Sequence, residues 1–148
     1  KSKINNMAFS SDFIVGYPGE TDYDFDKTID LIETVGFASS YSFKYSPRAG
    51  TQSSLKHLNV VNDNVSDLRL KKIQEILNKQ QNEFNLKFID KNEEVLFTDK
   101  GKKNNQFVGR TKYLQPVHVL CNRNIIGKKL EVNLESLTSF SFHGKIVN

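Results

Sequence analysis

Cysteine is nearly absent from this sequence of 148 residues, because Cys121 is the only one. A single cysteine excludes a disulfide within the chain and any site built from several of its thiolates. It fits a reducing cytoplasm, where we expect the protein to be located. Tryptophan is missing, and no apolar run approaches the ~20 residues of a membrane-spanning helix, so we expect a soluble chain with no membrane partner. The first residue is Lys1 rather than Met, and no signal-peptide pattern follows it, so we expect a piece of a longer protein.

The positive charge is confined to one half of the chain. Residues 1–80 hold ten Lys or Arg and ten Asp or Glu, whereas residues 81–148 hold eleven cations against seven anions and carry the whole net charge of +4. This asymmetry predicts two units, the second of which favours a polyanionic partner. An excess of lysine also serves simple solubility, so the charge alone does not decide between these roles.

The stretch DFIVGYPGETDYDF (residues 12–25) predicts a strand, a tight turn and a helix. Its apolar run indicates a buried strand, and its glycines and proline stop both regular structures. Thr21 can cap the helix, and we expect Glu20 only to help start it. One apolar stripe follows at helical spacing, formed by Phe25, Ile29 and Ile32. In parallel β/α units ligands bind at the carboxyl ends of strands, which here is the turn Gly16 to Glu20.

The next segments complete a β/α/β unit. SSYSFKYS (residues 39–46) alternates aromatic and polar residues, which predicts a strand parallel to the first. We expect its aromatic residues Tyr41 and Phe43 to pack in a core, whereas Tyr45, nearest the strand end, is the best candidate to stack on a base. A long helix is predicted from near Asp63 or Ser66, with an apolar stripe of Val65, Leu68, Ile73, Ile76, Leu77 and Phe84.

From Glu93 onward the sequence consists of short β-type runs separated by polar turns: EEVLFT, QFVGRT, PVHVL, KLEVNLES and SFHGKIV. Five such runs in about 60 residues predict a small closed or nearly closed barrel of the OB or SH3-like kind. We interpret DKGKKNNQ (residues 99–106) as a flexible hairpin loop. The sequence therefore predicts an α/β unit over residues 1–80 and an all-β unit over residues 81–148.

Two long motifs in this order resemble a known family. SSDFIVGYPGETDYDFDKTIDLIETVGF followed by SFKYSPRAGT is similar to the late part of the radical S-adenosylmethionine core of MiaB-type tRNA methylthiotransferases. The second half, with VGRT, IIGKKLEVNL and GKIV, resembles their C-terminal TRAM domain, a small RNA-binding β-barrel. The resemblance implies the C-terminal part of a partial (β/α) TIM barrel in residues 1–80 and a five-stranded OB-like TRAM barrel in residues 81–148.

The resemblance also implies a radical enzyme that adds a methylthio group to C2 of an isopentenylated adenosine next to the tRNA anticodon. Its cofactors would be S-adenosyl-L-methionine and two [4Fe-4S] clusters, and its partners the anticodon stem-loop of tRNA and an electron donor. We expect a monomer. Because a cluster needs several thiolates, we expect every cluster ligand to lie before Lys1. This chain alone would then be inactive, with no catalytic or metal-binding residue of its own.

Four residues of the first unit are candidate site residues. Asp12 matches the acid that, in related radical enzymes, accepts hydrogen bonds from the cofactor ribose, and Gly16 lies at the same rim, so the resemblance implies that both bind the cofactor. Capping a neighbouring loop is the alternative role for Asp12. Tyr45 lies nearest the end of the second strand and Arg48 lies just past it, where we expect both to meet the RNA substrate.

In the second unit we expect five cations to face RNA phosphates, namely Arg110, Lys112, Arg123, Lys128 and Lys129, with Lys102 and Lys103 of the loop adding to their charge. His118 and His143 do not form a metal pair on this pattern. We expect Cys121 to be a buried, small apolar residue.

Two other functions remain open. A sister methylthiotransferase would modify threonylcarbamoyl-adenosine in tRNA or an aspartate of a ribosomal protein, and YSPRAGT (residues 45–51) favours the tRNA-acting branch. A non-catalytic RNA-binding remnant is the other alternative. It is disfavoured because an incomplete barrel standing alone would expose strand edges and apolar surface.

Overall fold

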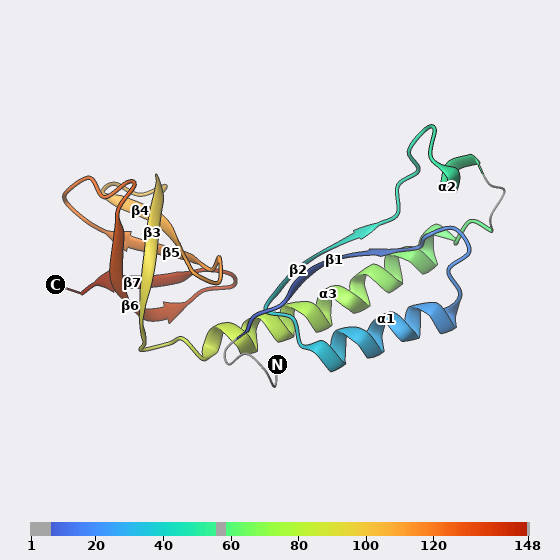
Figure 1. The fold of residues 1–148 in the computed structure, drawn as a ribbon, viewed down its shortest axis with the longest axis horizontal. Helices are drawn as coiled ribbons and strands as arrows, with labels where there is room; N and C mark the ends of the chain where they lie inside the picture. Colours follow the sequence, from blue (N-terminus) through green and yellow to red (C-terminus); the bar gives the residue numbers. More distant parts are fainter. Residues whose placement is uncertain (1–6, 56–58, 148) are drawn as a thin grey trace. The chain divides into compact units, whose positions relative to one another are not determined.

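The structure is a computed structural model that describes residues 7–55 and 59–147. The chain divides into two compact units, Lys1–Gln81 and Asn82–Asn148 (Figure 1). Among the helices in the described ranges, none is long and apolar enough to cross a membrane. Each unit has its own core and is described separately.

The first unit contains a parallel pair of strands and the helices that cover it. In chain order its elements are β1 (Ser10–Val15), α1 (Asp22–Val35), β2 (Ser39–Lys44), α2 (Gln52–Leu55) and the first part of α3 (Asp63–Leu86). Strands β1 and β2 pair in parallel, with Ser10 opposite Ser39 and Val15 opposite Lys44. The predicted parallel β/α/β unit is therefore confirmed.

Helix α1 begins and ends at the residues that its sequence signals indicate. Thr21 Oγ1 accepts a hydrogen bond from the Asp24 N–H at 3.2 Å, and Asp24 Oδ2 accepts one from the Thr21 N–H at 2.9 Å, which forms a capping box. Gly36 ends the helix in the left-handed conformation, with φ of 64°, and its N–H donates to Ile32. Local chemistry therefore defines both ends of α1.

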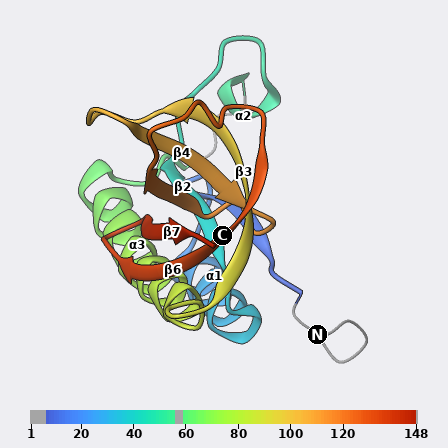
Figure 2. The same ribbon diagram turned by 90° about the vertical axis from the view of Figure 1, so that its left-hand side faces the viewer.

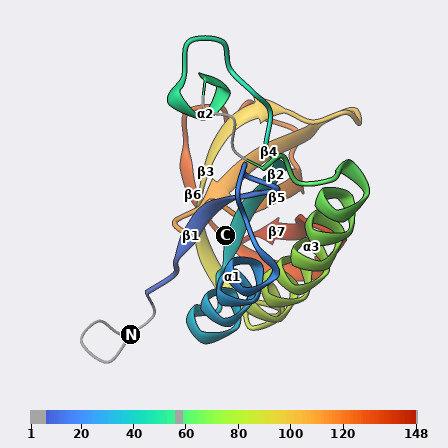
Figure 3. The ribbon, with the colours of Figure 1, turned by 90° about the vertical axis from the view of Figure 1, so that its right-hand side faces the viewer.

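The core of the first unit lies between the strands and the two long helices. Phe13 and Val15 of β1 pack against the predicted α1 stripe and against Ile73 and Leu77 of α3. Figures 1 and 3 show α1 and α3 side by side along the same face of the β1–β2 pair. The opposite face of these two strands is not covered by either helix.

The predicted stripe of α3 is wrong at its first turns. Val65 and Leu68 are 37% and 69% exposed, and the buried side chains there are Ser66 and Arg69. The reason is that this end of α3 packs against the polar turn that follows β1, whereas Ile73 and Leu77 meet the apolar core. A buried helix face need not be apolar where its partner is polar.

The aromatic side chains of β2 are also placed differently from the prediction. Tyr41 and Phe43 are 69% and 52% exposed, so within the described chain they are not core residues. Side chains alternate between the faces of a strand, and Phe13 and Val15 occupy the covered face. Tyr41 and Phe43 stack on each other at 6.5 Å on the open face, beside Ile14, which is 56% exposed.

The second unit is a closed barrel of five strands (Figure 2), which confirms the predicted architecture. The strands are β3 (Asn92–Lys100), β4 (Gln106–Thr111), β5 (Pro116–Leu120), β6 (Lys129–Leu137) and β7 (Phe142–Ile146). Their order around the barrel is β3-β4-β5-β7-β6, and all pairs are antiparallel except β5–β7. Nine buried apolar side chains fill the interior: Val95, Phe97, Phe107, Val117, Val119, Ile125, Val132, Leu134 and Phe142.

The last turns of α3 belong to the barrel unit. Asn85 is 2% exposed, and its Oδ1 accepts a hydrogen bond from Gln115 Nε2 at 2.8 Å. Tyr113, in the turn between β4 and β5, contacts the rings of Phe84 and Phe88 with centroids 5.5 and 5.2 Å away. One end of the barrel is thus closed by the end of this helix.

Candidate functional site

The turn after β1 (the rim turn, residues 16–20) is held by a hydrogen bond within the turn and by another to the segment before α3. The Gly16 N–H donates to Glu20 Oε2 at 2.7 Å, and the Gly19 N–H donates to the Asn59 carbonyl at 2.8 Å. Gly16 has φ of 71°, and a Cβ on it would lie 2.3 Å from Ser66 Oγ. Glycine is therefore needed at this position for close packing on α3. Its N–H is already bonded within the turn.

A buried ion pair joins the rim turn to α3. Arg69 Nη1 donates to Glu20 Oε2 at 2.6 Å, and Arg69 Nη2 donates to Asp22 Oδ1 at 2.6 Å. Burial by itself lowers the pKa of Arg69, but its hydrogen bonds to Asp22 and Glu20 outweigh burial and raise that pKa above its usual value. The expectation that Glu20 only starts the helix is wrong, because its carboxylate is 9% exposed and pairs with Arg69.

Sequence reasoning missed Arg69. Its only signal was its spacing of four and eight residues before Ile73 and Leu77, which puts a charge on the buried helix face. An arginine buried at such a position requires a carboxylate partner, and GYPGET supplies one.

Tyr45 lies beside the rim turn, as expected from its place after β2. Its ring meets that of Tyr17 edge-on at 5.1 Å, its N–H donates to the Val15 carbonyl, and its hydroxyl donates to Ser53 Oγ at 2.9 Å. Tyr17 is 47% exposed, so this aromatic pair borders solvent. Arg48 is exposed, and its carbonyl accepts hydrogen bonds from Thr51.

Asp12 lies inside β1 rather than at its end. It is opposite Tyr41, and its side chain is exposed on the open face of the strand pair. Gly16 lies four residues after Asp12, which is about 13 Å of extended chain, so the two predicted cofactor residues do not lie together. Their assignment to the cofactor stays a prediction.

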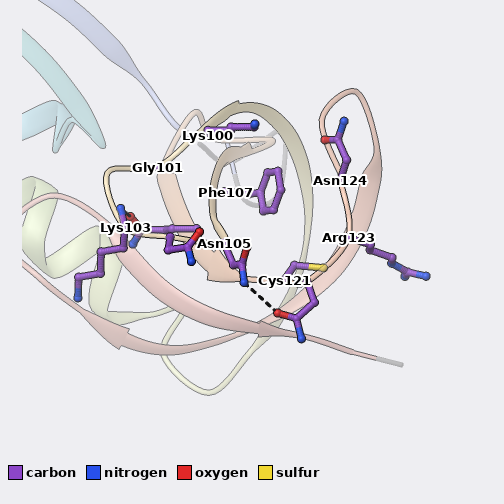
Figure 4. A pocket seen from close by; sticks show the side chains of 11 residues that line it. Lys100, Gly101, Lys103, Asn105, Phe107, Cys121, Arg123 and Asn124 are labelled. Carbon is purple, nitrogen blue, oxygen red and sulfur yellow. Dashed lines mark hydrogen bonds between the residues drawn. The ribbon is translucent and has the colours of Figure 1, made fainter.

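A second candidate site is an open hollow of about 330 Å³ at one end of the barrel (Figure 4). It lies where β3 ends, β4 begins and β5 ends, between the loops 101–105 and 121–124. Eleven residues line it, of which three are cations and none is acidic: Lys100, Gly101, Lys103, Asn104, Asn105, Gln106, Phe107, Cys121, Asn122, Arg123 and Asn124.

The five predicted phosphate-binding cations do not form a single surface. Arg123 lines the hollow, which lies at the start of β4. Arg110 lies near the other end of β4, and Lys112 lies in the turn that follows. Arg110 and Lys129 are both register partners of Leu96, so these two cations flank an exposed leucine on the outer face of the barrel. Lys128 lies next to them, just before β6.

Acidic residues already compensate two of these cations. Lys112 Nζ lies 3.6 Å from Glu93 Oε2, and Lys129 Nζ lies 2.5 Å from Glu94 Oε1. Arg110 donates to the Leu114 carbonyl at 2.8 Å. Sequence reasoning added Lys103 only as a minor contributor and did not single out Lys100, although both line the hollow beside Arg123.

His118 and His143 face each other across the parallel β5–β7 pair, with ring centroids 5.6 Å apart. His118 Nδ1 is buried without a hydrogen-bond partner in the described part of the chain. Burial, and then the nearby His143, lower the pKa of His118 below its usual value. Residues 7–55 and 59–147 contain no cluster of three or more His, Cys, Asp or Glu arranged to hold a metal ion. Cys121 is half-buried against the barrel core rather than fully enclosed.

The barrel residues match a known domain family: residues 89–147 correspond to the family model of the TRAM domain. The barrel of this chain is therefore similar to a TRAM domain. Two curated relatives, both named tRNA-2-methylthio-N(6)-dimethylallyladenosine synthase, are 51% identical to the chain over 115 residues. They come from the Welgevonden and Gardel strains of Ehrlichia ruminantium, and each alignment covers 78% of this chain and 26% of the relative.

The chain thus spans about a quarter of the length of the curated relatives it matches. With the TRAM domain, these relatives confirm the resemblance to MiaB-type tRNA methylthiotransferases. The TRAM match covers the hollow, the Arg110–Leu96–Lys129 row and the histidine pair, so all three are features of this domain.

Proposed function

We propose that this chain is part of a tRNA methylthiotransferase that adds a methylthio group to C2 of an isopentenylated adenosine next to the anticodon. The observation that carries the proposal is the 51% identity to two synthases named for this modification. The TRAM domain supports tRNA as the partner, because small barrels of this kind bind nucleic acid across a strand face and its loops. In this proposal the enzyme is a cytoplasmic monomer that receives electrons from a donor protein.

The first unit would form the C-terminal part of a (β/α) barrel. Its two strands are parallel, and α1 and α3 cover one face only. In barrels of this architecture the helices lie outside, and the other strand face points to the interior. The open face that carries Tyr41 and Phe43 would then be the inner one, and the rim turn would lie at the mouth.

The described residues do not fit an iron–sulfur cluster. A cluster needs several thiolates, whereas Cys121 is the only cysteine, and the described ranges contain no group of three or more His, Cys, Asp or Glu that could hold a metal ion. The proposal therefore places the ligands of both clusters outside this chain, which would be inactive alone. S-adenosylmethionine and the clusters would supply the radical and sulfur chemistry in the whole enzyme.

Two exposed polar groups of the first unit fit a nucleoside ligand, and one of them lies on the open face. Asp12 presents an exposed carboxylate there, and a carboxylate accepts the hydrogen bonds that paired ribose hydroxyls donate. Arg48 is exposed beyond β2 and can meet a phosphate or base. We assign Asp12 to the cofactor and Arg48 to the RNA within this proposal.

The test is nucleoside analysis of tRNA from cells that make the whole protein and lack any other methylthiolating enzyme. Mass spectrometry should detect 2-methylthio-N6-isopentenyladenosine, which should disappear when the gene is deleted. Methylthiolated threonylcarbamoyl-adenosine instead would assign the protein to the sister enzymes. Retained tRNA binding with no methylthiolated product in tRNA or ribosomal protein would identify a non-catalytic remnant.

A further inference from the structure

We propose that the hollow at the loop end of the barrel binds one unpaired nucleotide of an RNA. In this proposal Lys100, Lys103 and Arg123 bind its phosphates, and Asn105 and Asn122 contact its base edge. The inference rests on the proposed RNA-binding role of the TRAM domain. It goes further by naming the part of the barrel that binds RNA and by specifying that the bound nucleotide is unpaired.

The positive charge of the hollow is uncompensated. The hollow brings together three cations from β3, the β3–β4 loop and the loop after β5, with no acidic residue in its lining. No carboxylate pairs with any of the three among the residues that the structure describes, whereas Lys112 and Lys129 elsewhere on the barrel have glutamate partners. Unpaired cations gathered in a concavity raise the local potential and attract a polyanion.

The two loops that line the hollow are fastened to each other without a ligand. The Cys121 N–H donates to the Asn105 carbonyl at 2.9 Å, and Asn105 Nδ2 donates to Asn122 Oδ1 at 3.2 Å (Figure 4). Asn105 adopts a positive φ of 55°, which asparagine tolerates better than most residues. A site that is already ordered costs less conformational entropy on binding.

The β3–β4 loop, which the sequence suggests to be a flexible hairpin, is tied internally as well. Gln106 Oε1 accepts from the Lys103 N–H at 3.2 Å, and the Gly101 N–H donates to the Gln106 carbonyl at 2.7 Å. A Cβ on Gly101 would lie 2.4 Å from Gln106 Oε1, so glycine permits this close contact. The Lys100 and Lys103 side chains therefore project from a loop with a defined path.

Two side-chain amide groups in the hollow keep atoms available for a ligand. Because Asn105 Nδ2 and Asn122 Oδ1 bind each other, Asn105 Oδ1 and Asn122 Nδ2 remain as one acceptor and one donor. Neither makes a further hydrogen bond within the described ranges. Adjacent donors and acceptors are what base edges present, and asparagine recognises adenine in this way.

The size of the hollow favours one unpaired nucleotide over a helix. About 330 Å³ lies at the lower end of the range of roughly 300–1,000 Å³ for small-ligand sites. The base edges of A-form RNA are accessible only in a shallow groove, whereas unpaired bases can enter a pocket. Phe107 at the wall adds an apolar surface beside the polar groups.

Fluorescence anisotropy on the whole chain tests this inference, with a short labelled single-stranded RNA as probe and unlabelled duplex RNA as competitor. The charge variant is Lys103→Ala with Arg123→Ala. The matched control is Lys91→Ala with Lys145→Ala, which removes equal charge from exposed positions that do not line the hollow. Circular dichroism should show that all variants keep the fold.

We expect the hollow variant to reduce the magnitude of the slope of log affinity against log salt by roughly 1.4, or ~0.7 for each lost phosphate contact, and the control to leave it unchanged. Asn122→Ala should keep the slope but reduce discrimination among single-stranded homopolymers. The inference would be overturned if the hollow and control variants reduced this slope equally, or if duplex RNA competed as well as unlabelled single-stranded RNA. Either result would leave RNA binding by the domain intact. Absence of any RNA binding, or binding of an acidic peptide instead, would overturn the proposed role of the domain together with the inference.

Discussion

Arg69 and Glu20 form an ion pair with side chains only 7% and 9% exposed, although they are 49 residues apart in sequence. The same Glu20 oxygen accepts the Gly16 N–H, so one carboxylate fastens the turn after β1 to α3. A buried pair is weak evidence for net stability, because both charges lose hydration. Removing Glu20 is nevertheless costly, because the buried Arg69 then keeps only the exposed Asp22 as its carboxylate partner and the Gly16 N–H loses its acceptor.

Glu20→Ala should therefore lower the free energy of unfolding of the first unit by about 3–5 kcal/mol. Asp22→Ala is the matched control, because Asp22 also pairs with Arg69 but is 95% exposed, and it should cost less than about 1 kcal/mol. Urea unfolding followed by NMR signals of α1 amides measures both. Equal losses in the two variants would show that burial does not determine the effect of this pair.

Gly16 should tolerate alanine less well than Gly19, although both glycines have positive φ, of 71° and 89°. A Cβ on Gly16 meets Ser66 Oγ, whereas nothing lies within 4 Å of a Cβ on Gly19. Both substitutions place alanine in the left-handed region and carry its strain. The difference between their losses of unfolding free energy is therefore the cost of overpacking against Ser66, about 1–3 kcal/mol. Thermal unfolding of the two variants gives this difference. It should shrink when Gly16→Ala is combined with Ser66→Gly.

Most of the architecture was predictable because it depends on local patterns. The α1 stripe, its Thr21 cap and the five strand segments follow from spacing and turn residues within a few positions. The burial of Arg69 was not predictable in this way, because its partner lies in the rim turn. Tyr41 and Phe43 were misplaced for a similar reason: alternation predicts a strand but does not say whether both its faces are covered.

The candidate sites show the same division. Residue type alone identified the barrel cations as candidates for phosphate binding. Which of these cations lie close together depends on which loops contact each other. Arg123 joins Lys103 because Asn105 and Cys121 bond two loops together, whereas Lys112 is paired with Glu93 at another place. Such pairings are long-range and have no signal in a single sequence.

The barrel should lose stability as the pH falls below about 6.5, the ordinary pKa of a histidine. Burial and the neighbouring His143 lower the pKa of His118, so the unfolded chain takes up its proton at a higher pH than the folded chain does. The stability that neutral His118 contributes is therefore fully present above the unfolded pKa. It declines as the pH falls from the unfolded pKa to the lower folded pKa, and it levels off once folded His118 is protonated. Val108 on β4 and His143 on β7 are its neighbours in register.

Hydrogen exchange of barrel amides at several pH values measures this loss. His118→Gln should flatten the profile near pH 6.5, whereas His143→Gln should keep a reduced slope, because burial of His118 remains. A profile that is the same in wild type and His118→Gln would assign the loss to other groups. An imidazole titration by NMR gives the pKa of His118 directly.

Asn85 should link the end of α3 to the stability of the barrel. Thr111 Oγ1 donates to Gln115 Oε1 at 2.8 Å, and Gln115 Nε2 donates to Asn85 Oδ1 at 2.8 Å, so three buried side chains form one hydrogen-bonded chain. Asn85→Ala leaves the Gln115 amide buried without its acceptor, which should cost about 1–3 kcal/mol. Asn82→Ala, at an exposed position on the same helix, should change stability by less than about 0.5 kcal/mol.

The double variant Asn85→Ala with Gln115→Ala distinguishes a specific hydrogen bond from a general loss of packing. If the amide pair is the cause, the double variant should cost clearly less than the sum of the two single variants, because the second substitution removes the group that the first left unsatisfied. Additive losses would mean that each side chain acts by packing alone. Urea unfolding monitored by NMR signals of Val117 and Val119, both buried in the barrel, reports on this unit without interference from the first one.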